Sequence, residues 1–128
     1  MQNYTEYDNI FEDVQNYLYS RIEYAVSCGI EESKIIIDPG IGFAKDLKGN
    51  LILVKRAGEL CGARFPVMMA LSRKSFLGQV TGRSVDDRLS GTLAADLYSV
   101  MNGASFVRVH DVKETVDTLA VLAAITNI

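Results

Sequence analysis

The 128-residue sequence lacks the segments that insert a protein into a membrane or direct it out of the cell. None of its apolar runs approaches the roughly 20 residues needed to cross a bilayer, and residues 1–6 are polar and acidic, unlike a signal peptide. An excess of basic charge is also missing, because 13 Lys and Arg stand against 16 Asp and Glu, for a formal net charge of -3. That balance argues against a general role on nucleic acid or membrane surfaces. We therefore predict a cytoplasmic protein with no nucleic-acid partner and no membrane partner.

Cysteine is scarce as well, with two residues in the whole chain. Cys28 and Cys61 do not form a CxxC pair, and each directly precedes a glycine at the end of a helical pattern. This arrangement favours reduced, partly buried thiols over a disulfide or a metal site.

Four helical patterns alternate with three short apolar segments. Glycines end the first three patterns, as is typical of the left-handed residue that closes a helix. The predicted helices cover about residues 10–26, 50–60, 93–101 and 113–125, and the predicted strands are 35–37, 65–70 and 106–107. Asn50 is the candidate N-cap of the second helix, and the last helix is expected to bury Val116, Leu119, Ala120 and Ala123.

This alternation predicts one α/β domain, residues 1–128, with a parallel sheet and right-handed crossovers. The strands are apolar throughout, as expected when both sheet faces are covered. Three parallel strands cannot close into a barrel, whose eight strands need about 250 residues. The chain also opens on a helix with no strand before it, so we expect a partial (β/α)8 barrel: three parallel strands and four main helices from its C-terminal part.

Polar residues follow each of the three strands directly. Asp38 follows the first strand, Lys74 the second, and Arg108 with His110 the third. The carboxyl ends of parallel strands meet at one edge of a sheet, where ligands bind in α/β folds. We therefore expect these four side chains to converge on one site, and an arginine near a histidine favours an anion such as phosphate.

For the neighbouring residues, purely structural interpretations stay open. The glycines after Asp38 do not form a dinucleotide fingerprint, because Lys45 stands where a third glycine would be needed, and the segment also fits a tight turn. Asp111 fits a capping box with Glu114. Arg88 is expected to form a surface ion pair beside the third helix.

Taken together, the motifs resemble the dihydropteroate synthase family over essentially the whole chain. The matching segments, in the family's order, are Asp38–Phe43 (DPGIGF), Ser72–Ser75 (SRKS), Arg88–Ala95 (RLSGTLAA) and Gly103–Ala104 with Arg108–Val112 (RVHDV). Two small departures are Ala44, where the family usually has glycine, and Leu71. The resemblance implies the last three strands of the family's eight-stranded barrel.

The resemblance also implies a reaction, in which a pterin-methyl diphosphate is joined to p-aminobenzoate with loss of diphosphate. Asp38 would accept hydrogen bonds from the amino-amide edge of the pterin, and Lys74 would donate to acceptors of the ring. Arg108 would lie over the pterin plane and, together with His110, would hold the diphosphate.

On the p-aminobenzoate side, Ser75 and the helix that starts there would receive the carboxylate. Phe43 would pack on the aromatic ring, and Ser72 and Arg73 would shape the pocket. Sulfonamides are the implied inhibitors, and Mg²⁺ is the implied metal, with its protein ligand outside this chain. The family is dimeric, which together with the open strand edges predicts a homo-oligomer.

Two other functions compete with the synthase. A pterin-dependent methyltransferase shares the barrel and a pterin pocket, although SRKS together with RVHDV is not expected there. A non-catalytic fragment that binds pterin or anions is the second, and we expect this chain alone to be inactive.

Overall fold

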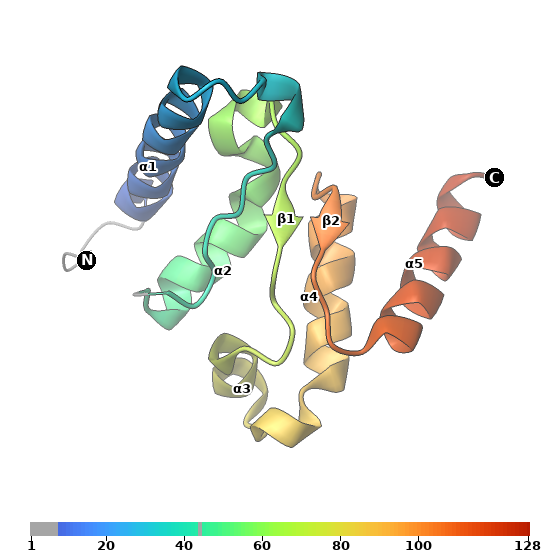
Figure 1. Ribbon diagram of the computed structural model, residues 1–128. Helices are drawn as coiled ribbons and strands as arrows, with labels where there is room; N and C mark the ends of the chain where they lie inside the picture. Colours follow the sequence, from blue (N-terminus) through green and yellow to red (C-terminus); the bar gives the residue numbers. More distant parts are fainter. Residues whose placement is uncertain (1–7, 44) are drawn as a thin grey trace.

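Helices pack around a short parallel sheet in the structure, a computed structural model that describes residues 8–43 and 45–128 (Figure 1). Within these residues the elements follow one another as α1 (Asp8–Ser27), η1 (Glu32–Lys34), α2 (Leu47–Arg56), η2 (Ala57–Ala63), β1 (Met68–Met69), α3 (Ser75–Thr81), η3 (Val85–Asp87), α4 (Leu89–Met101), β2 (Phe106–Val107) and α5 (Val112–Thr126). The four predicted main helices are present. The short helix α3 adds a fifth, which begins at the last residue of the SRKS segment.

Glycine ends two of the long helices, as predicted. Gly29 after α1 has φ +96° and Gly103 after α4 has φ +108°, a conformation that residues with a Cβ rarely adopt. In both places the next amide donates to the carbonyl five residues earlier, at 3.1 and 2.9 Å. This bond is the mark of a Schellman end, and it turns the chain from each helix back toward the sheet.

The predicted cap of the second helix is wrong. Asp46, not Asn50, caps α2, because its side chain accepts a hydrogen bond from the Gly49 amide at 2.7 Å. Asn50 is instead buried within α2, and its Oδ1 accepts from the Gly42 amide at 2.8 Å. It therefore anchors the loop that follows the first predicted strand.

The sheet is parallel, as predicted, but shorter than predicted. β1 pairs with β2 in the register Met68 with Phe106 and Met69 with Val107. The first predicted strand is reduced to one parallel bridge, between Ile37 and Val67. β1 is therefore central, with the Ile37 segment on one side and β2 on the other.

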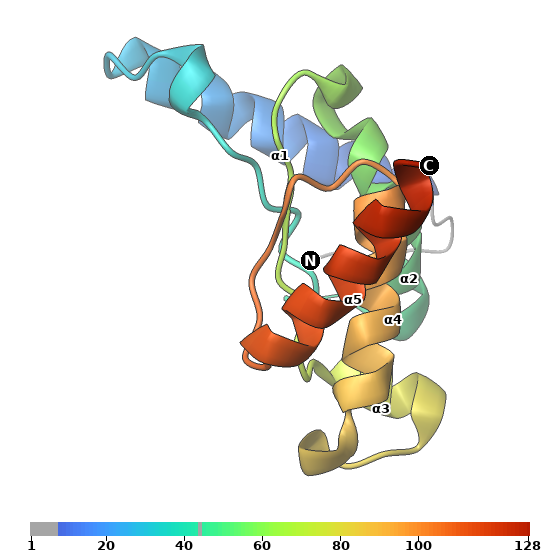
Figure 2. The ribbon, with the colours of Figure 1, turned by 90° about the vertical axis from the view of Figure 1, so that its right-hand side faces the viewer.

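One face of the sheet is covered and the other is open. Ile37, Val67 and Met69 are buried under the helices, whereas Ile36 and Phe106 are 46% and 45% exposed. Figure 2 shows the strand segments to one side of α2 and α4. The prediction that both faces are covered is therefore wrong for this chain, because no described segment packs on the face that carries Ile36 and Phe106.

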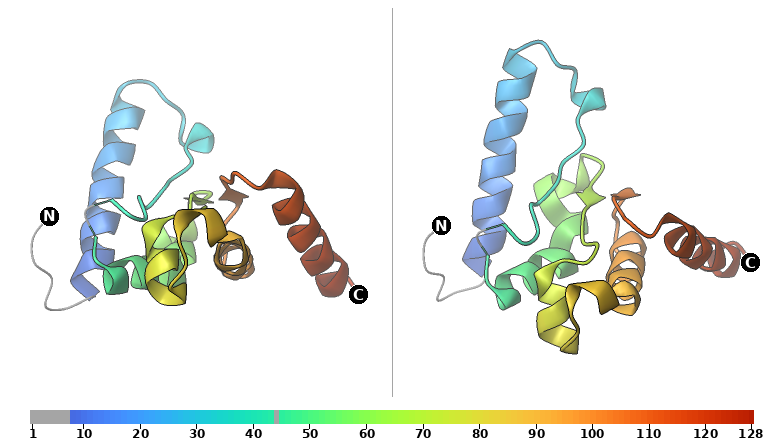
Figure 3. Two further views of the ribbon diagram at one scale, coloured as in Figure 1. Left: turned by 90° about the horizontal axis from the view of Figure 1, so that it is seen from below. Right: turned by 60° about the horizontal axis from the view of Figure 1, so that its bottom comes forward.

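The last helix also differs from its prediction. α5 packs beside α4 at the edge of the molecule (Figure 3), and Thr115 is its buried residue. Of the four residues expected to be buried, Val116 is 58% exposed, Ala120 and Ala123 are exposed, and Leu119 is half-buried. The apolar pattern of α5 predicts a helix face covered by other residues, and the described residues do not cover it.

Candidate active site

The alternation of side chains along parallel strands explains how the predicted site residues come together. Successive residues of a strand point to opposite faces. Ile37 and Val67 pair with each other and point to the covered face. The register therefore places three later residues on the open face: Asp38, Ala70 and Arg108. The open face thus ends in a polar residue at the carboxyl edge of the two outer segments, Asp38 and Arg108, and in Ala70 at the exit of β1.

A cavity of about 220 Å³ lies at this edge, between the exits of β1 and β2. Its lining residues are Ala70, Ser72, Lys74, Arg108, Val109 and His110. Ser72 Oγ lies 2.7 Å from His110 Nδ1 and accepts the His110 backbone amide at 3.3 Å. The two strand exits are therefore tied together within the cavity wall, while the Arg108 side chain is exposed and has no partner among the described residues.

Lys74 connects this cavity to the exit of the first strand segment. Its Nζ donates to the Ile41 carbonyl at 2.5 Å and lies 5.1 Å from the centre of the Phe43 ring. Burial lowers the pKa of Lys74, the Asp38 carboxylate opposes that shift, and Arg108 adds to it. Asp38, Lys74 and Arg108 are thus close enough to act on one another electrostatically.

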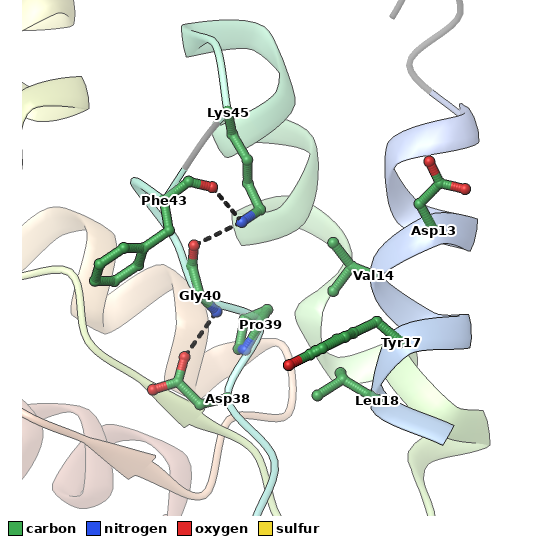
Figure 4. Close-up of a pocket in the computed structure, with 9 residues that line it drawn as sticks. All are labelled: Asp13, Val14, Tyr17, Leu18, Asp38, Pro39, Gly40, Phe43 and Lys45. Carbon is green, nitrogen blue, oxygen red and sulfur yellow. Dashed lines mark hydrogen bonds between the residues drawn. The ribbon is translucent and has the colours of Figure 1, made fainter. Parts of the chain in front are cut away.

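The loop after the first strand segment forms the wall of a second, larger cavity of about 400 Å³. Figure 4 shows Val14, Tyr17 and Leu18 pointing from α1 toward Pro39, with Asp38 at the other side. Asp38 Oδ1 accepts the Gly40 amide at 2.8 Å, which orients the carboxylate.

Lys45 holds this loop closed, a role that sequence reasoning missed. Its Nζ donates to the carbonyls of Gly40 and Phe43, both at 2.8 Å (Figure 4). Burial lowers the pKa of Lys45, Lys74 lowers it further, and Asp38 raises it. The sequence held one signal for this residue. Lys45 stands three positions after Gly42, where a dinucleotide-binding turn would need a third glycine.

Not every predicted site residue lines a cavity. Arg73 points to Asp111, with Nη2 at 3.0 Å from Oδ1, so Asp111 is an ion-pair partner and its side chain does not cap α5 as predicted. Ser75 is exposed at the first position of α3. Phe43 does line a cavity, the larger one (Figure 4), and its side chain is 68% exposed beside Lys74.

Arg88 also differs from its prediction as a surface ion pair. Its guanidinium donates to the backbone carbonyls of Arg73, at 3.0 Å, and Arg83, at 3.2 Å. The ion pair at this place joins Arg83 and Asp87 instead, at 3.7 Å. Arg88 is therefore bound to the SRKS turn itself.

Metal and membrane features are absent from the described part of the chain. Residues 8–43 and 45–128 contain no group of three or more His, Cys, Asp or Glu side chains placed to hold a metal ion. None of the described helices is long and apolar enough to cross a membrane. Both cysteines are free thiols, Cys28 exposed and Cys61 buried.

Comparison with known proteins matches residues 1–110 to the family of pterin binding enzymes. The chain belongs to this family. The match covers the site at the carboxyl edge of the parallel strands, which holds one carboxylate and three basic groups.

The similar proteins are dihydropteroate synthases. The enzyme of Escherichia coli K12 is 40% identical over 124 residues, which are 97% of this chain and 44% of that protein. The enzyme of Xanthomonas albilineans in complex with 7,8-dihydropteroate superimposes with a TM-score of 0.92 at 37% identity, over 100% of this chain and 49% of the other. The same enzyme with 4-aminobenzoic acid gives a TM-score of 0.92 at 36% identity, over 99% and 47%.

The enzyme of Yersinia pestis in complex with a sulfonamide drug matches equally well, with a TM-score of 0.90 at 35% identity over 98% of this chain and 46% of the other. The chain thus spans about half the length of the relatives it matches. Its fold is part of the barrel of these enzymes, as predicted.

Proposed function

We propose that this chain forms the C-terminal part of a dihydropteroate synthase site, which joins a pterin-methyl diphosphate to p-aminobenzoate. The observation that carries the proposal is the grouping of Asp38, Lys74, Arg108 and His110 at the carboxyl edge of the sheet's open face. Relatives of 35–37% identity bind 7,8-dihydropteroate, 4-aminobenzoic acid and a sulfonamide drug. A methyltransferase barrel is disfavoured, because these relatives are synthases.

The reaction needs stabilisation of a leaving anion. The amine nitrogen of p-aminobenzoate attacks the methylene carbon of the pterin; the new C–N bond forms as the C–O bond to diphosphate breaks. Diphosphate leaves with the bonding electrons, and the amine loses its proton to solvent. Arg108 and His110 would hold the departing charge, which lowers the barrier when the donors are already in place.

The Ser72 hydroxyl suits His110 for this role. A hydroxyl can donate to a ring nitrogen or accept from it, so the 2.7 Å contact fixes the orientation of the imidazole in the cavity wall.

Asp38 and Lys74 suit the pterin ring. A carboxylate accepts from the ring's amino and amide N–H groups, and Lys74 donates to its acceptors. The partly desolvated lysine, whose pKa is lowered, would be stabilised in its charged form by an electron-rich ring. Ser75 and Phe43 would contact p-aminobenzoate, with Ser72 and Arg73 shaping that pocket.

Mg²⁺ is the metal that the resemblance implies, and its protein ligand would lie outside this chain. The rest of the barrel would likewise supply the other walls of the site. We also propose a cytoplasmic location, which is the one predicted from the composition.

The test compares this chain alone with the chain joined to the remaining barrel of a homologous synthase. We expect no diphosphate release from the chain alone and turnover from the joined protein. In the joined protein, Lys74→Ala and Arg108→Ala should each lower kcat/KM by roughly 10²-fold or more. Arg64→Ala is the matched control, because Arg64 pairs with Glu32 at the opposite end of the strands.

Turnover by the chain alone would favour a self-sufficient enzyme, and near-normal kinetics of either variant would contradict its role. Binding without turnover in the joined protein would favour the non-catalytic alternative.

A further inference from the structure

A tight turn separates β1 from the lysine of the candidate site. The Lys74 amide donates to the Leu71 carbonyl at 3.2 Å, which places Arg73 at the third position of a four-residue turn. Arg73 has φ +60°. Glycine or asparagine usually fills such a position, because a larger side chain is strained in the left-handed conformation. An arginine there needs support from its surroundings.

Both backbone polar groups of Arg73 receive that support from the start of α4. The Arg73 amide donates to Thr92 Oγ1 at 3.1 Å, and Thr92 is completely buried. The Arg73 carbonyl accepts from Arg88 Nη1 at 3.0 Å. The Arg73 side chain is held separately by its ion pair with Asp111.

Arg88 also fixes the helix that follows the turn. A Cβ placed on Gly78 in α3 would lie 2.7 Å from Arg88 Cζ, so the guanidinium lies directly against the α3 backbone. Arg88 Nε donates in addition to the Arg83 carbonyl at 3.2 Å. One side chain thus connects the turn before α3, the middle of α3 and the loop after it.

We propose that Thr92 and Arg88 are positioning residues for Lys74. By holding Arg73 in the left-handed conformation, they set the direction in which the chain leaves the turn and so direct Lys74 toward the Ile41 carbonyl and the site. Neither residue lines the cavity. The consequence for catalysis rests on the proposed function of Lys74, whereas the support of the turn does not.

Matched variants separate the hydrogen bond from simple packing. Thr92→Val keeps the shape of the buried side chain and removes the acceptor, and Thr92→Ser keeps the acceptor and removes the methyl group. Arg88→Lys keeps the charge but cannot reach both carbonyls and cover Gly78. Arg83→Ala is the control, because it removes a neighbouring cationic side chain that does not bind the turn.

Two NMR measurements on the intact chain report on the conformation of the turn and do not require enzymatic activity. The first is the hydrogen-exchange rate of the Arg73 amide, and the second is the pKa of Lys74 from titration of its Nζ signal. We expect Thr92→Val and Arg88→Lys to speed exchange at Arg73 by roughly 10-fold or more and to move the pKa of Lys74 up toward that of an exposed lysine. Thr92→Ser and Arg83→Ala should leave both unchanged.

The outcomes decide between positioning and packing. If Thr92→Ser is as disruptive as Thr92→Val, or if Arg88→Lys changes neither measurement, the proposal is overturned. If Thr92→Val does not fold, the half-buried Arg88 and its lysine variant carry the test. In the joined protein described above, Arg88→Lys should lower kcat/KM only if Lys74 acts in the reaction. A perturbed turn with normal kinetics therefore contradicts the proposed function and leaves the support of the turn intact.

Discussion

The two ends of the chain bury different kinds of residue. Every residue of the buried apolar core lies between Ile10 and Leu77, in the part that runs from α1 to α3. The part that runs from α4 to α5 buries Thr92, Asp96, Ser99 and Thr115, and it exposes apolar side chains such as Val116 and Ile125 on α5. The first part holds the buried apolar core, against which Ala95, Ala104 and Val107 of the second part pack, whereas α5 presents apolar surface outward.

The difference is sharpest at Asp96 on α4. This residue is completely buried, and neither of its carboxylate oxygens has a hydrogen-bond partner among the described residues. The Ser99 hydroxyl, one turn further along, is unpartnered as well. Burial raises the pKa of Asp96 to about 6, since an unpaired carboxylate is costly away from water. Stability thus depends on apolar packing in one part and on protonation in the other.

The largest expected effect comes from removing a core side chain of the first part. Leu53 is completely buried in α2, so Leu53→Ala should lower the free energy of unfolding by roughly 2–5 kcal/mol through lost burial and the cavity left behind. Val116→Ala on α5 should change it by less than about 0.5 kcal/mol. Urea denaturation of both variants makes the comparison. Equal losses would show that α5 is covered in solution and would remove the contrast between the parts.

The second effect depends on pH and belongs to α4. Because the pKa of Asp96 is raised, the folded state binds more protons than the unfolded state between the ordinary carboxyl range and pH 6. Its contribution is therefore favourable at low pH and is lost as the pH rises through about 6. Asp96→Asn should raise the free energy of unfolding by about 3 kcal/mol at pH 8, at roughly 1.4 kcal/mol for each unit by which the pKa is raised, and leave it nearly unchanged at pH 4.

Denaturation across this pH range gives the measurement for Asp96. The matched control is Asp87→Asn, which removes an exposed carboxylate paired with Arg83 in place of a buried one. A constant difference between Asp96→Asn and the natural sequence at all pH values would mean that Asp96 stays ionised or finds a partner in solution.

Local patterns in the sequence predicted the parts of the fold that depend on local chemistry. Helical periodicity and the glycines at 29 and 103 gave the long helices and their ends. The order of strands and helices gave the parallel sheet, and polar residues at the strand ends gave the grouping of Lys74 with Arg108 and His110.

Features that depend on distant partners could not be predicted in this way. Asp111 fits a helix cap locally, but the Arg73 side chain competes for it and forms the ion pair. Arg88 fits a surface pair locally, but two backbone carbonyls bind it more closely. For α5 the periodicity identified an apolar face correctly, and only the surface that would cover that face lies outside the described residues.

The smallest effect on stability, and the last test of the contrast, concerns association through the second part. α5 exposes Val121 and Ile125 by 60% and 66%, and α4 exposes Met101 by 64%; exposed apolar patches of this kind favour contact with another molecule. We expect sedimentation equilibrium at micromolar concentration to give a dimer or a higher oligomer, as predicted from the sequence. Val121→Lys should weaken association by about 10-fold, since a charge is then buried in the contact, while unfolding of the monomer changes by less than about 0.5 kcal/mol. Val85→Lys, at a valine of η3 that is 51% exposed, should leave association unchanged. A monomer at all concentrations would show that the apolar face of α5 is tolerated in water, and unchanged association of Val121→Lys would place the contact elsewhere than on this part of α5.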